Sequence, residues 1–599
     1  MKKFIILLFS IGLGSVMLTS CLEEYLDKAP ESGLSEDLVF TTYTNFMSYL
    51  NGCYTGVGNS SYDIRRTYPI RLNQYSWGIG REIMTDMSDN CLRQEGTVIK
   101  GGNMGGIIDY FTFARCPILY GSFSVVRRCN VILDKVDMLT DAVQEDIDDI
   151  KGQAHFLRAF ATFEVFRWWG PMPYITKVVG VDDQWDMPRL SKHETLMKIA
   201  ADMDTAYSYF EKAGRVRRDP QLPSSPGHLT HQDMHRPNGV AAKAAKARAL
   251  LYAASPLNNE HGVADWQDAA IACWEALQIA DQYGYALMTA ANYKLNYIGT
   301  TYTNEMFLGY AAGNNIQNLI ALGPPNECPT QNAVDMFETR WGDPLNTEAE
   351  RNAAATMGHY NEQAPFANRD PRFYIDIVYN TCPLPGLGTA KIYWEKVGNE
   401  IKYGELFDKP NYLSITNTGY YLRKTWLERN LKNVVTKSYS DPVLRYGELL
   451  LNYAEAANEA YGPNTPAPGA TMTAVDAINK IRGRWTAAQL APVQAQFTVS
   501  TETFRPRIKN ERNVELSWEG HYFNDIRRWM DAPVVMSGKV AGVDIEKVPV
   551  STEYPTGYKY TRFELPPERQ VAWKDAMYYW PFGKDDNYKM KNFVPNEVW

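Results

Sequence analysis

Apolar residues recur at spacings of three and four along several long segments of the chain. The clearest case is residues 194–213, which Gly214 follows where a helix would end. Its apolar positions are Leu196, Ile199, Met203, Ala206 and Phe210. Because this spacing places the side chains on one face of an α-helix, the segment predicts an amphipathic helix that packs against a core.

Two further segments repeat the pattern with smaller residues. Residues 238–255 open on Asn238, a favourable N-cap, stop before Pro256 and carry alanine at most apolar positions. The third segment precedes Gly284, with its stripe at Trp266, Ala269, Cys273, Ala276, Ala280 and Tyr283. Three successive helices of this kind, joined by Gly- and Pro-rich connectors, predict stacked helical hairpins of the tetratricopeptide type.

Other long segments also predict helices. These are residues 144–169, 442–461, 474–484 and 508–531. The first of them runs into Gly170 and Pro171, and proline prevents its continuation. The chain is therefore expected to be mostly helical.

Residues 291–440 differ in composition and show no long helical stripe of apolar residues. They are rich in Gly, Pro, Asn and aromatic residues, and they contain only short alternating stretches such as Ile375–Tyr379. This predicts irregular loops with a few short strands, packed on the helical scaffold. Binding residues concentrate on such loops because a rigid scaffold holds them in place.

The first residues predict where the protein works. Lys2 and Lys3 precede an apolar run that reaches Met17, and small residues then lead to Cys21. This is typical of a lipoprotein signal peptide, residues 1–20, which is removed so that Cys21 carries the lipid. The alternatives are an ordinary secretory peptide and a transmembrane anchor, but the run is shorter than the roughly 20 residues that a span needs.

Composition narrows the class of ligand. The net charge of −8 and the pI near 5.7 argue against a nucleic-acid partner, which needs a clustered basic surface. Aromatic residues make up 13% of the chain, and the few that are exposed on loops would suit stacking on sugar faces. The cysteines contain no CxxC pair, and we expect them to be scattered small hydrophobic residues.

Several sequence blocks, taken in order, resemble the SusD/RagB family of nutrient-binding outer-membrane lipoproteins. The most specific resemblance comes from two adjacent blocks, Glu511–Leu516 and Glu519–Trp529. The others are Gln153–Ala159 with Trp169–Pro173, Arg236–Asn238, Arg369–Arg372, Arg445–Glu448 with Ala454–Ala456, and Ile478-Asn479 with Ile481-Arg482. The ending, with Trp580-Pro581-Phe582 and Asn592–Trp599, resembles the family more divergently.

The resemblance implies a SusD-like fold, with four tetratricopeptide-like units and a loop-rich remainder. It divides the mature chain into residues 21–290 and 291–599, with residues 441–531 helical again. It also implies a partner, a SusC-like TonB-dependent barrel that the protein caps as a lid on the outer membrane, facing the cell exterior. The ligand, most simply a glycan, is held between lid and barrel, and no catalysis is implied.

The block from residue 511 to 529 is dense in charge and could be mistaken for an acid/base site. Glu511, Glu515 and Glu519 are like-charged neighbours at helical spacing, and Arg512 can offset part of their repulsion. The favoured interpretation is structural: these charges form ion pairs that hold the C-terminal helices on the body. The set comprises Glu511, Glu515, Glu519, Asp525, Arg527 and Arg528. Arg369-Asp370 and Arg445 with Glu448 invite the same interpretation.

Two stretches have ligands for metal ions. His228, His231 and His235 have a spacing that could hold a metal, but a solvated loop is the favoured interpretation because nothing orients the rings. Residues 85–90 offer hard oxygen ligands for calcium without the EF-hand spacing. They resemble a family segment near the binding face, so ligand contact through Asp89 or Asn90 is a hypothesis.

Aromatic residues in polar or glycine-rich surroundings are the candidates for contact with a sugar. Trp341 and Tyr302 are the preferred two, because their neighbours are hydrophilic. The other candidates are Tyr75, Trp77, Tyr110, Tyr297 and Tyr360. For any one of these rings, burial in the core is the simpler explanation.

These observations favour a surface glycan-binding lipoprotein that serves import. A RagB-like peptide-binding lipoprotein is the main alternative. A lipid-anchored glycoside hydrolase would need a carboxyl pair at roughly 5–10 Å, and no hydrolase motif accompanies the blocks. A helical-repeat adaptor is disfavoured by the loop-rich insertion. No resident cofactor is expected, apart from the calcium that residues 85–90 could bind.

Overall fold

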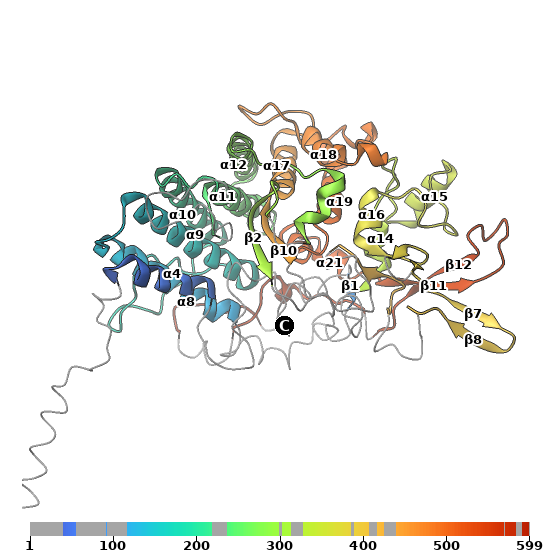
Figure 1. Cartoon of the computed structure of the whole chain (residues 1–599), viewed down its shortest axis with the longest axis horizontal. Coiled ribbons are helices and arrows are strands. Elements are labelled where there is room, and N and C mark those ends of the chain that lie inside the picture. The colour runs from blue at the N-terminus through green and yellow to red at the C-terminus, as the bar shows by residue number, and fades with distance from the viewer. Residues whose placement is uncertain are drawn as a thin grey trace, which may run out of the picture.

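A row of long α-helices forms one side of the molecule, and short helices, short strands and loops form the other (Figure 1). The computed structural model describes residues 40–55, 91–92, 117–218, 236–298, 302–312, 328–384, 388–406, 416–424, 439–567, 570–582 and 590–597. Some predictions therefore fall outside the described residues: the signal peptide, Cys21, Tyr75, Trp77, residues 85–90 with Asp89 and Asn90, Tyr110, and the histidines at 228, 231 and 235.

The helical array consists of helices that pack on one another in series. Each of α8 to α12 contacts the next, α12 contacts α17, and α18 and α19 both pack on α17. Their bounds are α4 Tyr43–Thr55, α8 Pro117–Lys135, α9 Gln144–Trp169, α10 Lys192–Lys212, α11 Gly239–Ala254, α12 Val263–Gln282, α17 Tyr446–Tyr461, α18 Ala474–Gly483 and α19 Thr501–Glu515. The predicted mostly helical scaffold is confirmed.

Capping side chains fix the starts of α10 and α11, and the cap at Asn238 was predicted. The Asn238 side chain accepts a hydrogen bond from the backbone N–H of Ala241 at 2.8 Å, which satisfies one free donor at the start of α11. Ser191 caps α10 in the same way, accepting from Glu194 at 3.0 Å. The helix at 144–169 has the predicted bounds, and Gly170 follows it with a φ of 77°.

Small apolar residues make the centre of the array. Helix α11 lies between α10 and α12, and its alanines Ala241, Ala247 and Ala254 are fully buried. On α9, a Cβ added at Gly152 would lie 2.8 Å from the ring of Phe210 on α10, so the glycine permits this contact. The array therefore packs as closely as its alanine and glycine stripes suggest.

The array is interrupted. Helices α12 and α17 pack together (Figure 1), although residues 283–445 lie between them in sequence. The insertion holds α14 Gln331–Met336, α15 Glu348–Thr356 and α16 Pro371–Asp376, with η4 Ala290–Asn296 and several short strands. The division of the mature chain at residue 290 stays a prediction.

Strands far apart in sequence join the insertion to the C-terminal region. The largest sheet has the order β12-β11-β7-β8, in which β11 is antiparallel to β12 and parallel to β7. These strands are β7 Trp394–Val397, β8 Glu400–Tyr403, β11 Ala541–Lys547 and β12 Tyr558–Glu564. The insertion thus packs on the C-terminal region through the pairing of β7 with β11. The strands β11 and β12 were not predicted from the sequence.

The remaining strands form two-stranded ribbons. Their pairs are β2 Met306–Ala312 with β10 Tyr439–Arg445, β1 Cys91–Leu92 with β3 Cys328–Pro329, β4 Ile377–Val378 with β9 Tyr421–Leu422, and β5 Pro383–Leu384 with β6 Gly388–Thr389. A few short strands in the loop-rich region were expected, and this is confirmed.

Three predicted boundaries were wrong. Residues 442–445 belong to β10, because they pair with β2, and α17 begins only at Tyr446. The helix predicted over 508–531 is α19 followed by α20 Tyr522–Arg528, because Trp518 and Gly520 adopt positive φ between them. Of the alternating stretch Ile375–Tyr379, only β4 is strand.

The cysteines behave as small hydrophobic residues where the structure describes them. Cys53, Cys129, Cys273, Cys328 and Cys382 are buried. Among the described helices none is both long and apolar enough to cross a bilayer.

Candidate functional site

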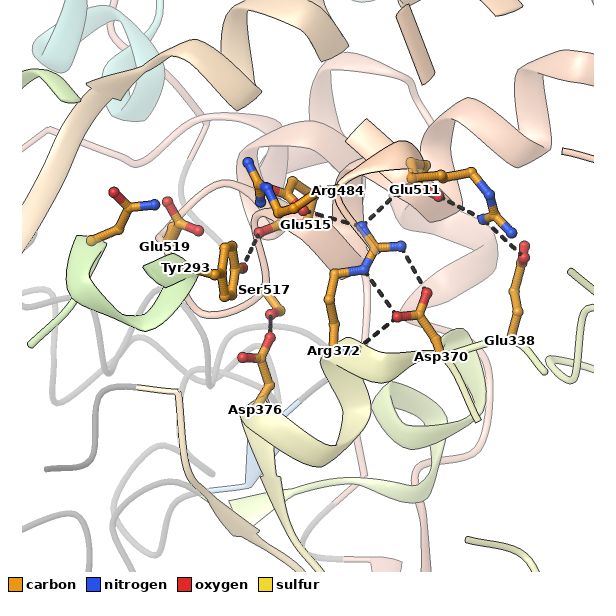
Figure 2. Close-up of polar contacts among 12 residues, drawn as sticks. Tyr293, Glu338, Asp370, Arg372, Asp376, Arg484, Glu511, Glu515, Ser517 and Glu519 are labelled. Carbon is orange, nitrogen blue, oxygen red and sulfur yellow. Dashed lines mark hydrogen bonds and ion pairs between the residues drawn. The ribbon is translucent and has the colours of Figure 1, made fainter. Parts of the chain in front are cut away.

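The charge-dense C-terminal block meets the insertion in a buried network of ion pairs, which we call the charge network (Figure 2). It joins α16 and the chain around residue 424 to α19 and the loop that follows it. Its cations are Arg372, Lys424, Arg445, Arg482, Arg484 and Arg507, and its acids are Glu305, Glu338, Asp370, Asp376, Glu511, Glu515 and Glu519.

Arg372 lies at the centre of one half of the charge network. Its guanidinium makes two hydrogen bonds to Asp370, at 3.1 and 2.7 Å. The third nitrogen, Nη1, donates to Glu511 at 2.6 Å and to Glu515 at 3.1 Å. Arg372 is fully buried, so every charge it meets comes from the protein.

Glu515 connects this half to the next. Its carboxylate accepts from Arg445 at 2.9 Å and from Arg484 at 2.8 Å, in addition to Arg372. Arg445 and Arg484 also share Glu305, at 2.8 and 3.0 Å. Two acids and two guanidiniums therefore alternate around one buried point.

Gly447 is required by this crowding. A Cβ at this position would lie 2.9 Å from Oε1 of Glu305 and 3.2 Å from Oε1 of Glu515. Gly447 stands in the block Arg445-Tyr446-Gly447-Glu448, so the glycine of that block leaves room for the carboxylates.

The outer ends of the charge network reach two loops. Lys424 donates to Glu519 at 2.9 Å and to the carbonyl oxygens of Glu515 and Ser517, both at 3.0 Å. Ser517 in turn donates to Asp376 at 2.9 Å. At the other end, Glu338 accepts from Arg482 and pairs with Arg507.

Opposite charges, not burial, set the protonation of the acids at the centre. Burial alone would raise the pKa of Glu515, but Arg484 and Arg445 outweigh it and hold that pKa well below its ordinary range. Burial also acts against Glu519, yet Arg445 and Lys424 lower the pKa of Glu519 to about 2. Burial raises the pKa of Asp376 to about 6, because Lys424 at 3.9 Å offsets it only in part.

The charge network is not placed to act on a substrate. Its carboxylates are 7% exposed or less, and each accepts hydrogen bonds from neighbouring side chains or backbone groups. A general acid or base must reach the proton it transfers. The prediction that Glu511, Glu515 and Glu519 pair structurally is confirmed.

A second group of buried ion pairs holds α20. Asp525 bridges Arg512 and Arg528, both at 2.7 Å, and Arg528 also pairs with Glu455 of α17. This confirms the structural interpretation for Asp525 and Arg528. Arg512, which was expected to offset part of the repulsion among the glutamates, pairs with Asp525, because the helix break at Gly520 folds α20 back towards it.

Two predicted ion pairs were wrong, those of Arg527 and Arg369. Arg527 makes no ion pair among the described residues: it donates to the carbonyl oxygens of Tyr578 and Arg167 and lies over the rings of Trp168 and Phe523. Burial lowers the pKa of Arg527 to about 10. Arg369 likewise donates to backbone carbonyls, of Phe337, Pro365 and Val334.

Trp341 lies on a tight turn at the surface of the insertion. The turn closes with the N–H of Gly342 on the carbonyl of Thr339, and Gly342 has a φ of 85°. The half-buried indole stacks on His359, with ring centroids 4.1 Å apart, and the Arg340 guanidinium lies 4.4 Å from its centroid. Trp341 is therefore a held, partly exposed indole among polar groups.

Asp343 orients the imidazole beneath the indole. His359 Nδ1 lies 2.7 Å from Asp343, which also accepts from Thr339 and Gln494. Burial opposes the charge of Asp343, but these hydrogen bonds outweigh it and lower the pKa of that carboxyl. We call Trp341, Arg340, His359 and Asp343 the indole site.

Of the other described aromatic candidates, two are buried and Tyr302 is half-buried. The hydroxyl of Tyr302 donates to the carbonyl of Gly309 on β2 at 2.6 Å, and the ring is half-buried. Tyr297 is fully buried and donates to Glu519 at 3.0 Å, so it belongs to the core. Tyr360 is 6% exposed and packs with Leu345 and Ala354. The hydroxyl of Tyr302 thus binds to β2 and not to the indole site.

A small groove of about 320 Å³ lies elsewhere, between α10, α11 and α12. Its walls are mostly apolar, with Asp204, Lys246 and Asp268 among its polar residues. None of the predicted ligand residues lines it, and its volume is at the lower limit for pockets that bind small molecules.

Sequence reasoning missed several members of the charge network. Glu305 stands alone before β2, and Lys424 follows β9 in a stretch whose nearest charges are not its partners. Their partners lie 140 and 95 residues away, at Arg445 and Glu519. Helical spacing carries no signal at such separations, so only the fold reveals these pairs.

Comparison with known proteins covers nearly the whole chain. The model of the SusD family matches residues 281–599, and a second model, described as starch-binding associating with outer membrane, matches residues 24–213. SusD-like protein P25 of Formosa agariphila is 24% identical over 419 residues, 68% of this chain and 68% of that protein.

Solved structures share the fold. A SusD-like protein from Bacteroides fragilis has a TM-score of 0.68 and 22% identity, covering 96% of this chain and 100% of the other. A SusD-like carbohydrate binding protein from the same species has a TM-score of 0.65 and 21% identity, covering 92% of this chain and 99% of the other. At these identities the likeness establishes the fold.

Proposed function

Since the chain belongs to the SusD family, we propose that it is an outer-membrane surface lipoprotein that binds a nutrient glycan and delivers it to a SusC-like TonB-dependent transporter. In this proposal Cys21 carries the lipid anchor, and the protein serves as the lid of the barrel. No catalytic step is involved. The carbohydrate-binding relative of the same fold supports a glycan as the ligand.

Beyond family membership, the proposal rests on the observation that the carboxylates of the charged block are buried and paired with cations. A glycoside hydrolase would need one carboxyl that protonates a substrate oxygen and a second that faces the sugar. In the charge network, the carboxylates are buried and form ion pairs with guanidinium and ammonium groups. Asp376, with a pKa of about 6, is fully buried as well. This supports binding over hydrolysis.

The indole site is the described surface that best suits a sugar. A rigid indole supplies apolar surface, and the guanidinium and imidazole groups beside it supply hydrogen bonds to hydroxyls. Arg340 and His359 lie against the Trp341 ring and hold its orientation, and Asp343 holds His359. We propose Trp341 as a ligand contact, with Tyr302 as a second. Asp89, Asn90, Tyr75 and Trp77, which lie outside the described residues, are proposed as further contacts.

Calorimetric titration of the full-length chain in detergent tests the proposal, against polysaccharides of plant, host and microbial origin and against peptide digests. We expect heat with a glycan, and a loss of about tenfold in affinity in Trp341→Ala, since a well-stacked ring contributes up to about 1.5 kcal/mol. Trp185→Ala is the matched control, because Trp185 is 56% exposed and lies in the helical half.

Each other outcome changes the proposal in a defined way. Heat with peptides alone would assign the RagB-like function. Shortening of a bound oligosaccharide would make the protein a hydrolase and end the binding-only proposal. Isolation from membranes without any TonB-dependent barrel, after cross-linking, would remove the lid role.

A further inference from the structure

A separate group of metal-ligating side chains lies on the helical array. His193 is in the first turn of α10, His261 precedes α12 in the loop from α11, and Asp265 is in the first turn of α12. Helices α10 and α12 lie on the two sides of α11 (Figure 1). This group is therefore assembled from two helices that do not neighbour each other in sequence.

The three side chains converge on one point. His261 Nδ1 is 3.1 Å from Oδ1 of Asp265, and His193 Nδ1 is 3.5 Å from Oδ2 of the same carboxylate. The two imidazole rings have centroids 4.5 Å apart and are nearly perpendicular. One ligand atom from each residue lies within 4.8 Å of the other two.

Backbone hydrogen bonds fix the carboxylate. Oδ2 of Asp265 accepts from the N–H groups of Glu260 at 3.1 Å and His261 at 3.0 Å. The acid therefore caps the turn that brings His261 into place. A second acid, Glu260, approaches the N–H of His193 at 3.4 Å. The ammonium of Lys192 is directed away, to the carbonyl of Leu257.

Hydrogen bonding within the group leaves one nitrogen unused. Nδ1 of His193 is buried and makes no hydrogen bond to any described residue, although the Asp265 carboxylate is 3.5 Å away. A buried ring nitrogen without a partner costs free energy. A cation between the imidazole and the carboxylate would satisfy both.

We propose that His193, His261 and Asp265 bind a divalent transition-metal ion, with the ligand chemistry of Zn²⁺. Bonds of about 2.0–2.1 Å place two tetrahedral ligands about 3.3 Å apart. His261 Nδ1 lies 3.1 Å from Oδ1 of Asp265 and His193 Nδ1 lies 3.5 Å from Oδ2, so each imidazole is near that spacing from one of the two carboxylate oxygens. His261 is 58% exposed in its side chain, so its ring has room to turn and close the remaining separation. The ion joins α10 to α12 across α11.

The test is calorimetric titration of the full-length chain, purified in detergent without a polyhistidine tag, with ZnCl₂. We expect one tight site per chain and a loss of at least about tenfold in affinity in both His261→Ala and Asp265→Asn. His261 is exposed, so its variant keeps the fold, and Asn keeps an acceptor for the backbone N–H groups. Co²⁺ in place of Zn²⁺ should give the intense visible absorption of a tetrahedral site, lost in the same variants.

The loop histidines provide the control. In the triple variant His228→Asn, His231→Asn and His235→Asn, the tight site should persist, and Zn²⁺ should raise the melting temperature as in the unmodified chain. Absence of saturable binding would overturn the proposal. So would equal affinity in His261→Ala, or loss of the site in the triple variant alone.

Discussion

The helical array and the charge network hold their parts together by different means. In the array, alanine and glycine stripes let α9 to α12 approach closely, and the buried side chains are mostly apolar, with single ion pairs such as Arg158 with Asp202 between α9 and α10. In the charge network, the insertion docks on α19 through guanidinium and carboxylate groups that are almost fully buried. We expect the array to lose stability in small steps as contacts are removed. The charge network should lose much more when any one partner of an ion pair is removed.

The difference follows from desolvation. A buried apolar contact contributes in proportion to its area, so trimming it costs a proportionate amount. A buried charge costs several kcal/mol unless it is paired, so removing one partner exposes the full cost of the other. The comparison can be tested by perturbing each region in a matched way.

Removing the central arginine should give the largest effect. Arg372→Ala leaves Asp370, Glu511 and Glu515 short of a buried partner, and we expect a loss of about 3–5 kcal/mol in the free energy of unfolding. Urea denaturation followed by circular dichroism measures this change.

Arg505→Ala is the control, on α19. Arg505 pairs with Glu459 but its side chain is 39% exposed, so its loss should cost less than about 1 kcal/mol. If the two variants lose equal stability, burial does not distinguish the charge network from a surface pair.

Acid should weaken the charge network over the pH range in which Glu519 becomes protonated. The folded-state pKa of Glu519 is about 2, below its ordinary value of 4.5, so the stabilisation is present above pH 4.5 and is lost as the pH falls towards 2. This shift corresponds to about 3 kcal/mol. Hydrogen exchange followed by mass spectrometry should show α16 losing protection at a higher pH than α11.

A variant isolates the contribution of this carboxyl. Glu519→Gln should be less stable at pH 7 and should show a shallower fall in stability below pH 4.5. Simultaneous loss of protection in α16 and α11 at every pH would mean that the two regions unfold as one unit.

One glycine from each region provides the smallest, most direct comparison. Gly152→Ala presses on the Phe210 ring in the array, and Gly447→Ala presses on Glu305 and Glu515 in the charge network. We expect each to cost about 1–3 kcal/mol, with the larger loss at Gly447 because charged atoms must move. Thermal unfolding of the two variants provides the measurement.

Gly483→Ala is the matched control, because nothing lies within 4 Å of its added Cβ in α18. Helix propensity alone should then raise stability, by up to about 1 kcal/mol. A larger loss at Gly152 than at Gly447 would contradict the expected ranking of the two regions.

The sequence predicts the array well and the charge network only in part. Residues 144–169 and the cap at Asn238 were predictable because periodicity and capping are local. The pairing of Glu515 was predicted, but not its partners Arg372, Arg445 and Arg484, because two of these come from elements far away in sequence. Likewise β11 and β12 escaped prediction, and the stacking of His359 on Trp341 depends on the tertiary fold.

The gap between α12 and α17 has a consequence for the order in which the chain folds. Helices α8 to α12 pack on sequence neighbours, but α17 must close a loop formed by residues 283–445 before it reaches α12. Closure of a loop of that length costs about 4.5 kcal/mol in chain entropy. We therefore expect α8 to α12 to assemble early. Until α17 docks, the surface of α12 that faces α17 should remain exposed to water. A mutation in the insertion would then slow folding of the array without touching a single residue in it.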